Sequence, residues 1–119
     1  MSARSQLAST LKTALPTMRV VGTERAPDKF IKPTVVIRQR DYTPAGNAQG
    51  TLLAGLVISI YSHILDIEKA EDALDAALPD LLAALHAIPS ITWKRAAKVL
   101  YADTYLGFDV EVTIPVNVS

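Results

Sequence analysis

The sequence contains no cysteine, and this absence removes a whole class of chemistry. Without a thiol there is no disulfide framework, no thiolate metal cage and no thiol nucleophile, and the redox state of the compartment does not affect the fold. Two histidines, His63 and His86, remain as candidate bases or metal ligands. Twelve basic and twelve acidic side chains cancel, which argues against a nucleic-acid binder that relies on net positive charge.

Long apolar runs are missing as well. The longest, from Leu52 to Tyr61, is interrupted by Gly55 and Ser59 and has about half of the roughly 20 residues that cross a bilayer as a helix. The N-terminal segment, Met1 to Leu15, is broken by Ser, Thr, Gln and Lys and lacks the apolar core of a secretory signal. We therefore expect no membrane span and no export signal, and a protein that is assembled in a cytoplasm.

The sequence does contain enough apolar material for one packed core. Half of its 119 residues are apolar, and a chain of this length predicts a single domain, residues 1–119. Apolar spacing predicts the order helix, strands, helix, strands, without the alternation of a βαβ fold. The predicted class is α+β, with a mostly antiparallel sheet of four to five strands and two helices packed on one face. The predicted helices span 5–15 and 66–88, and the predicted strands span 17–23, 34–40, 51–63, 91–102 and 105–118.

The strand predicted at 51–63 is apolar on both faces. Such a strand is central in its sheet and is covered twice. Helices provide one cover. The second is either another subunit or an N-terminal segment that folds across the sheet.

A cluster of turn-forming residues follows the strand predicted at 34–40. Pro44, Gly46 and Asn47 occur within the segment Asp41 to Gly50, which predicts a ten-residue connection. That length exceeds the usual two to five residues of a hairpin loop and is often functional, although a flexible hairpin tip is an equal alternative. At its root, Arg38 and Arg40 share one face of the strand, predicted to be the solvated one.

Two prolines set further expectations. Pro79 lies within the long helix that Asp66 is predicted to cap, and an interior proline costs about 3 kcal/mol. It predicts a kink or two abutting helices, and the apolar stripe that continues in phase past it favours the kink. Pro115 lies in the last strand, where it cannot donate to a ladder, so that end is predicted to lie at a sheet edge or a bulge.

Catalytic groupings are scarce. His63 and Asp66 lie three residues apart at a strand-to-helix junction, where an acid–base pair or metal site is conceivable, but a structural role beside a helix cap is the stronger interpretation. His86 at a helix C-terminus needs no catalytic explanation. No serine has a nucleophile-elbow context and there is no glycine-rich phosphate loop. We predict neither an enzyme nor a cofactor or metal. The acidic helix residues are interpreted as a solvated or partner-facing surface: Glu68, Glu71, Asp72 and Asp75.

Charge is divided unevenly along the chain. Residues 1–40 hold eight basic and two acidic side chains, a balance of +6, whereas residues 41–119 hold four basic and ten acidic ones, a balance of −6. A head-to-tail contact between copies would use such a split, because a positive patch can meet a negative patch on the next copy. The two halves can equally pair within one subunit, because antiparallel folding brings them together.

Taken in order, these elements resemble the tail terminator, or tail completion, proteins of long-tailed bacteriophages, the family of the lambda tail terminator. The resemblance covers nearly the whole chain and is a pattern of elements and composition, without a catalytic signature. It is carried by the opening helix that ends at Pro16, PTVVIRQ (Pro33 to Gln39), GLVISIYS (Gly55 to Ser62), DIEKAEDALDAALPDLLAAL (Asp66 to Leu85) and WKRAAKVLYADTYLGFDVEVTIPV (Trp93 to Val116).

The resemblance implies a structural role in a virion. Such proteins form a ring, usually a hexamer, that caps the tail tube, stops its polymerisation and presents a surface to the head. The implied partners are further copies of the chain, the tail tube protein and the head–tail connector protein, with at most weak contact to DNA in the channel. The implied location is the head-proximal end of the tail. Contacts to a neighbouring subunit or to the tube are expected at Arg38, Arg40, Asp41, Tyr42, Asn47 and Gln49.

Two other readings of the sequence remain. A head-to-tail connector or head-closure protein has a similar size and setting. A small ligand-binding or enzymatic α+β domain would use a pocket near His63 and Asp66.

Overall fold

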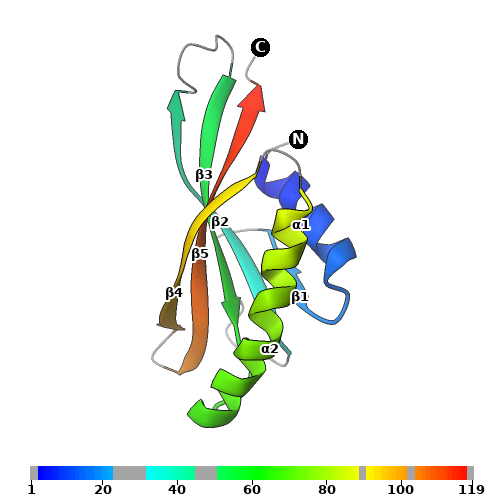
Figure 1. The fold of residues 1–119 in the computed structure, drawn as a ribbon, viewed down its shortest axis with the longest axis vertical. Helices are drawn as coiled ribbons and strands as arrows, with labels where there is room; N and C mark the ends of the chain where they lie inside the picture. The colour runs from blue at the N-terminus through cyan, green and yellow to red at the C-terminus, as the bar shows by residue number, and fades with distance from the viewer. Residues whose placement is uncertain (1–2, 23–31, 45–50, 89–90, 102–103, 118–119) are drawn as a thin grey trace.

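A five-stranded sheet with two helices on one face forms the fold, as seen in a computed structural model that describes residues 3–22, 32–44, 51–88, 91–101 and 104–117 (Figure 1). The strand order is β1-β2-β3-β5-β4, and only the β1–β2 pair is parallel. This confirms the predicted α+β class. The helices are α1 (Ala3–Ala14) and α2 (Ile67–His86), and the strands are β1 (Arg19–Val21), β2 (Thr34–Pro44), β3 (Thr51–Tyr61), β4 (Thr92–Tyr101) and β5 (Tyr105–Asn117).

Helix α1 forms because Leu7 and Leu11 recur four residues apart and fall on one helix face. Both side chains are buried, and Leu15 continues the stripe just beyond the helix. The Leu15 amide donates to the Leu11 carbonyl at 2.8 Å, and Pro16 then stops the pattern. The predicted opening helix is confirmed.

Helix α2 begins where the carboxylate of Asp66 accepts a hydrogen bond from the Lys69 amide at 3.1 Å, so the predicted N-cap is confirmed. Its buried residues are Ala70, Leu74, Leu81 and Leu85. Pro79 lies inside the helix on its exposed side, and the chain remains one helix across it. Two abutting helices, one of the two predicted alternatives, are therefore not what forms.

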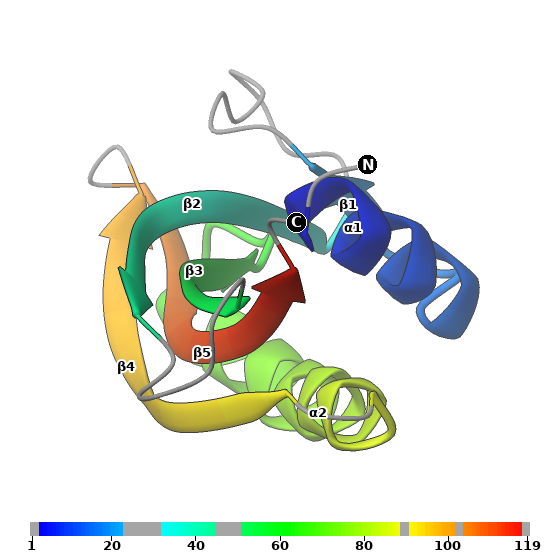
Figure 2. The ribbon, with the colours of Figure 1, turned by 90° about the horizontal axis from the view of Figure 1, so that it is seen from above.

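The core lies between the helices and one face of the sheet. Ile58 in β3 lies opposite Ile37 of β2 and Val110 of β5, and all three side chains are fully buried. Figure 2 shows α1 and α2 on the same side of the strongly twisted strands. An N-terminal segment crossing the second face of β3 was one sequence-based alternative, and it is wrong for the described residues because α1 packs into the same core as α2.

Strand β5 has the alternation that the sequence predicts. Val110 and Val112 are buried beneath the helices, whereas Asp109 and Glu111 lie on the other face. Strand β4 pairs with β5 only as far as the Thr113 position, so Pro115 lies beyond the end of β4. The predicted edge position of this proline is confirmed, because no β4 partner is left to require its missing N–H.

The predicted loop 41–50 has the wrong start. Strand β2 runs on to Pro44, with Asp41 opposite Gly55 of β3, after a register shift between Gln39 and Asp41 that leaves Arg40 at a bulge. Pairing with β3 satisfies this backbone, and such non-local pairing overrides the local turn preference. Residues 45–50, which include the expected contact residues Asn47 and Gln49, lie outside the described residues.

Candidate binding surface

The face of the sheet that carries no helix is the candidate surface, and we call it the helix-free face. Side chains from four strands alternate onto it. One row across the sheet joins Arg38, Val57, Glu111 and Arg95 in β2, β3, β5 and β4. The face therefore mixes apolar and charged groups.

A partly buried polar network lies at the centre of this face. Arg38 Nη2 donates to Ser59 Oγ at 2.7 Å and to Asp109 Oδ1 at 3.3 Å, and Ser59 Oγ donates to the same Asp109 oxygen at 2.5 Å. Ser59 is fully buried, and the Asp109 side chain is 28% exposed. Because donors and acceptor are held against β3, charge-assisted hydrogen bonds fix the guanidinium in place.

A second, more exposed network lies one step toward the β2–β3 hairpin. Arg40 Nη1 reaches Glu111 Oε1 at 3.1 Å and Arg40 Nε reaches Asp41 Oδ2 at 3.3 Å, while Arg95 lies 3.9 Å from Glu111. These side chains are between 33% and 69% exposed. Each pair is worth little on its own in solvent, but together they orient the bulge at Arg40.

These contacts decide part of the charge question left open by the sequence. Arg38 and Arg40 belong to the basic first third of the chain, yet each pairs with a carboxylate 71 residues later in the same subunit. For these two residues, pairing within one subunit is the alternative that forms. They lie on the face expected from the sequence, but they are not free cations.

From the last β4 pair, Thr92 with Thr113, strands β2, β3 and β5 continue as a projecting three-stranded extension, which we call the blade (residues 40–44, 51–55 and 113–117; top of Figure 1). Tyr42, an expected contact residue, is 52% exposed on it, and Leu52, Leu53, Ile114 and Val116 are half-buried. At its base lies a hollow of about 410 Å³. The hollow is lined by Arg40, Asp41, Thr43, Leu53, Gly55, Thr92, Lys94, Thr113 and Pro115.

The opposite end of the helix-free face is covered by aromatic side chains. Tyr61 and Val36 are buried there, and the rings of Tyr61 and Tyr101 lie 5.2 Å apart at 44°. Gly107 lies opposite Tyr61 in β5, and a Cβ at this position would collide with the Tyr61 ring and the Ile60 carbonyl. This glycine is required by close approach, and it lets the tyrosine lie flat on the sheet.

The geometry at His63 and Asp66 does not support the enzymatic alternative. The Asp66 carboxylate caps α2, and no hydrogen bond joins it to His63, whose Nδ1 is buried without a partner among the described residues. Within the same residues, no group of three or more His, Asp or Glu side chains could hold a metal ion. Nor is either described helix long and apolar enough to span a membrane.

Sequence reasoning missed Ser59, Asp109 and Lys94 as parts of the surface. Alternation placed Asp109 on the correct face, but its partner depends on β5 lying beside β3, which no local pattern encodes. A serine inside a strand that is apolar on both faces was the available signal for Ser59, since a hydroxyl buried in such a strand needs a partner.

Searches with protein-family models and against curated proteins find no match to this chain. The functional conclusion therefore rests on the chain's own residues and contacts.

Proposed function

We propose that this chain is the tail terminator of a long-tailed bacteriophage. Copies of the chain form a ring that caps the tail tube, stops its polymerisation and offers a surface to the head–tail connector protein. The proposal joins the family resemblance of the sequence to a subunit whose most distinctive surface suits a protein partner better than a small substrate.

The blade is the observation that carries this proposal. It extends three strands past β4, and it presents exposed Tyr42 on one face and half-buried Leu53 on the other. Apolar side chains on a projecting, helix-free part of a sheet are typical of a surface that another protein covers. The ion pairs of Arg38 and Arg40 at its root hold it in one orientation, as docking on a repeating tube requires.

The hollow at the base of the blade suits a protein partner as well. Its lining combines threonines, Leu53 and Pro115 with the charges of Arg40, Asp41 and Lys94. Among its described residues there is no histidine, and no hydrogen bond joins a threonine hydroxyl to Asp41 or Lys94. A side chain from a tube subunit is the occupant that such a mixed lining favours.

Contact with DNA in the channel is weak under this proposal. Arg38 and Arg40 are neutralised by Asp109 and Glu111, which leaves Lys94 as an exposed cation of this face. A surface with few unpaired cations releases few counterions and does not hold passing DNA.

The test combines the purified chain with polymerising tail-tube protein of the phage that encodes it. Electron microscopy is expected to show tubes of limited length with an extra ring at one end. The double variant Tyr42→Ala/Leu53→Ala should reduce the fraction of capped tubes at least about tenfold, a loss equivalent to about 1.4 kcal/mol. Leu82→Ala, which shortens a half-buried leucine of α2, is the control and should cap normally.

Two results would count against the proposal. A chain that never caps tubes at any concentration removes it. A chain that binds the head connector but leaves tube growth unchanged favours a head-closure protein instead.

A further inference from the structure

Three large apolar side chains are exposed at the end of the molecule opposite the blade. Leu65 is 63% exposed, Ile67 54% and Leu100 50%. Leu65 and Ile67 flank the start of α2, and Leu100 is near the end of β4. Helix α2 and strand β4 run in opposite directions, and both of these ends lie in the lower half of Figure 1.

An ion pair sets the register of α2 against β4 at this end. Lys98 Nζ lies 3.0 Å from Glu71 Oε1. Leu100 is two residues further along β4, about 7 Å away on the same face of the strand. Ile67 is four residues earlier in α2, about 6 Å away on the same side of the helix. Because the two elements are antiparallel, both steps lead toward the same end of the molecule, where Ile67 and Leu100 are exposed.

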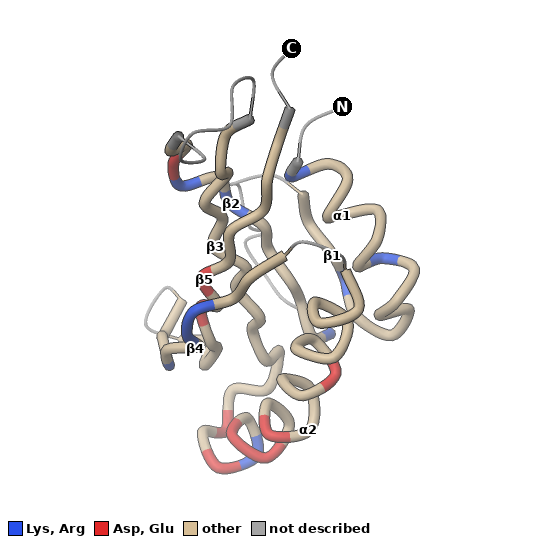
Figure 3. Tube along the Cα trace, turned by 45° about the horizontal axis from the view of Figure 1, so that its top comes forward, with Lys and Arg blue, Asp and Glu red and all other residues tan. Residues whose placement is uncertain are grey.

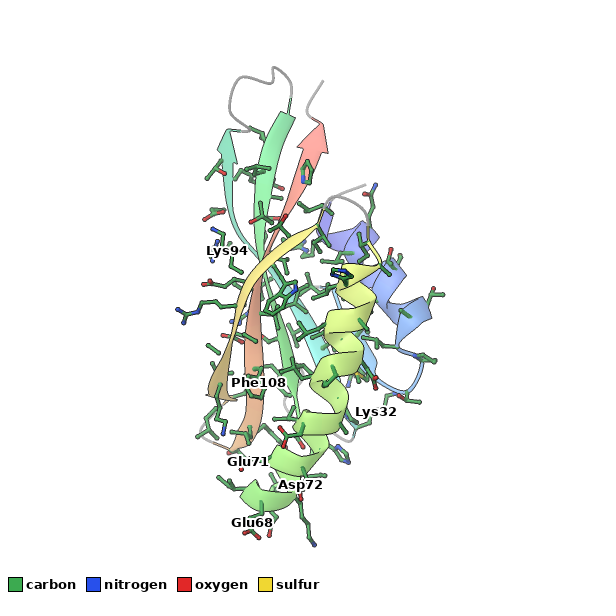
Figure 4. All side chains as sticks on the ribbon, in the orientation of Figure 1. Lys32, Glu68, Glu71, Asp72, Lys94 and Phe108 are labelled. Carbon is green, nitrogen blue, oxygen red and sulfur yellow. The ribbon has the colours of Figure 1, made fainter. Side chains whose placement is uncertain are left out.

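Acidic side chains border these apolar residues. Figure 4 shows Glu68, Glu71 and Asp72 together at this end of α2. Glu71 pairs with Lys98, whereas Glu68 and Asp72 are exposed and have no ion pair among the described residues. We call Leu65, Ile67, Leu100, Glu68 and Asp72 the apolar–acidic end.

The other flank of the molecule has the opposite charge. Helix α1 and strand β1 contain basic but no acidic residues, as the blue positions in Figure 3 show. Lys12 and Arg19 are exposed there, and neither has an ion pair within the described part of the chain. Arg38 and Arg40 are engaged internally, whereas Lys12 and Arg19 leave free positive charge on this flank.

A hollow of about 430 Å³ is lined by residues that lie between Lys12 and Arg19 in the sequence and by residues of α2. Its apolar lining includes Pro16 and Met18, and Asp80 is its one acidic member. We call this hollow, together with Lys12 and Arg19, the basic hollow. Its full lining is Ala14, Leu15, Pro16, Thr17, Met18, Asp80, Ala83 and Ala84.

We propose that the apolar–acidic end of one copy of this chain seats in the basic hollow of the next copy. Leu65, Ile67 and Leu100 supply the apolar contact, and Glu68 and Asp72 meet Lys12 and Arg19. The two surfaces are different parts of the subunit, so the contact is heterologous. Such a contact closes into a ring when the rotation between neighbouring copies is 360° divided by a whole number. This inference rests on the proposed function and assigns the subunit contact within it.

Charge complementarity selects a second copy as the occupant. Among the described residues, Glu68 and Asp72 form no ion pair in their own subunit, and neither do Lys12 and Arg19, while Asp80 is the only charged residue that lines the hollow. The chain as a whole is neutral. Each surface therefore has its complement on another copy, in equal supply.

Charge reversal tests this contact. The acid-reversed variant is Glu68→Lys/Asp72→Lys, and the base-reversed variant is Lys12→Glu/Arg19→Glu. Each variant alone juxtaposes like charges at every contact, and its dissociation constant should rise at least about tenfold by sedimentation velocity. An equimolar mixture should assemble like the wild type, because every contact in an alternating ring is again between opposite charges.

A matched control and an uncharged variant complete the experiment. Lys94→Glu/Arg95→Glu changes the same residue types on the helix-free face and should self-associate normally. Ile67→Ser removes apolar contact without altering charge and should also weaken assembly, while circular dichroism reports an unchanged fold.

The possible outcomes separate this inference from the proposed function. If the wild type assembles and caps tubes but the reversed variants do so equally well, or if mixing restores nothing, the contact lies elsewhere and the terminator role stands. A wild-type chain that stays monomeric at every concentration overturns the inference, and failure to cap tubes then also removes the proposed function.

Discussion

The two faces of the sheet are formed by the same strands but differ in what their side chains contact. On the helix-covered face, Leu56 and Ile58 of β3 are fully buried in the apolar core. On the helix-free face, the next residue, Ser59, enters a hydrogen-bonded network with Arg38 and Asp109. The first face provides most of the free energy of folding through burial. The second keeps polar groups that are fixed in place and available at a surface, which is what specific recognition needs.

Truncation of equivalent leucines on the two faces should give the largest contrast. Leu56→Ala removes a fully buried side chain and should lower the free energy of unfolding by about 2–5 kcal/mol. Leu53→Ala makes the same change on the same strand, but on the half-buried blade, and should cost about 1 kcal/mol. Urea denaturation of both variants measures the difference, and equal losses would mean that the blade belongs to the core.

The polar network should behave as one unit. Asp109→Ala leaves both Arg38 and Ser59 without their acceptor and should cost about 1–3 kcal/mol. Ser59→Ala should cost less, and the double variant less than the sum of the two, with a coupling of at least about 0.5 kcal/mol. A double-mutant cycle by thermal or urea unfolding reads this coupling, and strict additivity would show that the hydrogen bonds are not shared.

The two glycines of the helix-free face should differ in their tolerance. A Cβ at Gly107 meets the Ile60 carbonyl and the Tyr61 ring, so Gly107→Ala should cost about 1–3 kcal/mol. A Cβ at Gly55 meets the carboxylate of Asp41, an exposed side chain that can rotate away, so Gly55→Ala should change stability by less than about 1 kcal/mol. Melting temperatures in one buffer compare them, and a destabilising Gly55→Ala would mean that Asp41 is held rigidly.

The smallest effect is expected at the outer ion pairs. Arg40→Ala removes contacts between side chains that are 37% and 33% exposed and should cost less than about 1 kcal/mol, with the loss reduced further by added salt. Arg38→Ala should cost more, because it also removes the donor to buried Ser59. Unfolding at low and high ionic strength distinguishes them, and a salt-insensitive loss at Arg40 would reveal packing instead of charge.

Local signals predicted most elements of the fold. The spacing of Leu7 and Leu11 predicted α1, the Asp66 cap predicted the start of α2, and the alternation around Val110 predicted which face of β5 is buried. The candidate surface was predicted only in part. Arg38, Arg40 and Tyr42 were named, but Asp41 lies in a strand and not in the expected loop, and the basic pair is neutralised. A carboxylate 71 residues away cannot be inferred from neighbours in the chain.

The sequence by itself determined which segments become helices and strands, and which side of each strand avoids water, because those properties depend on side chains a few residues apart. Only the tertiary structure decided the strand order, the parallel β1 and the extension of β2 past the bulge at Arg40. The tertiary structure also decided which basic side chains are paired within the subunit. Arg38 and Arg40 form ion pairs with Asp109 and Glu111 of β5, whereas Lys12 and Arg19 form none among the described residues. Only the folded sheet determines which distant strands become neighbours.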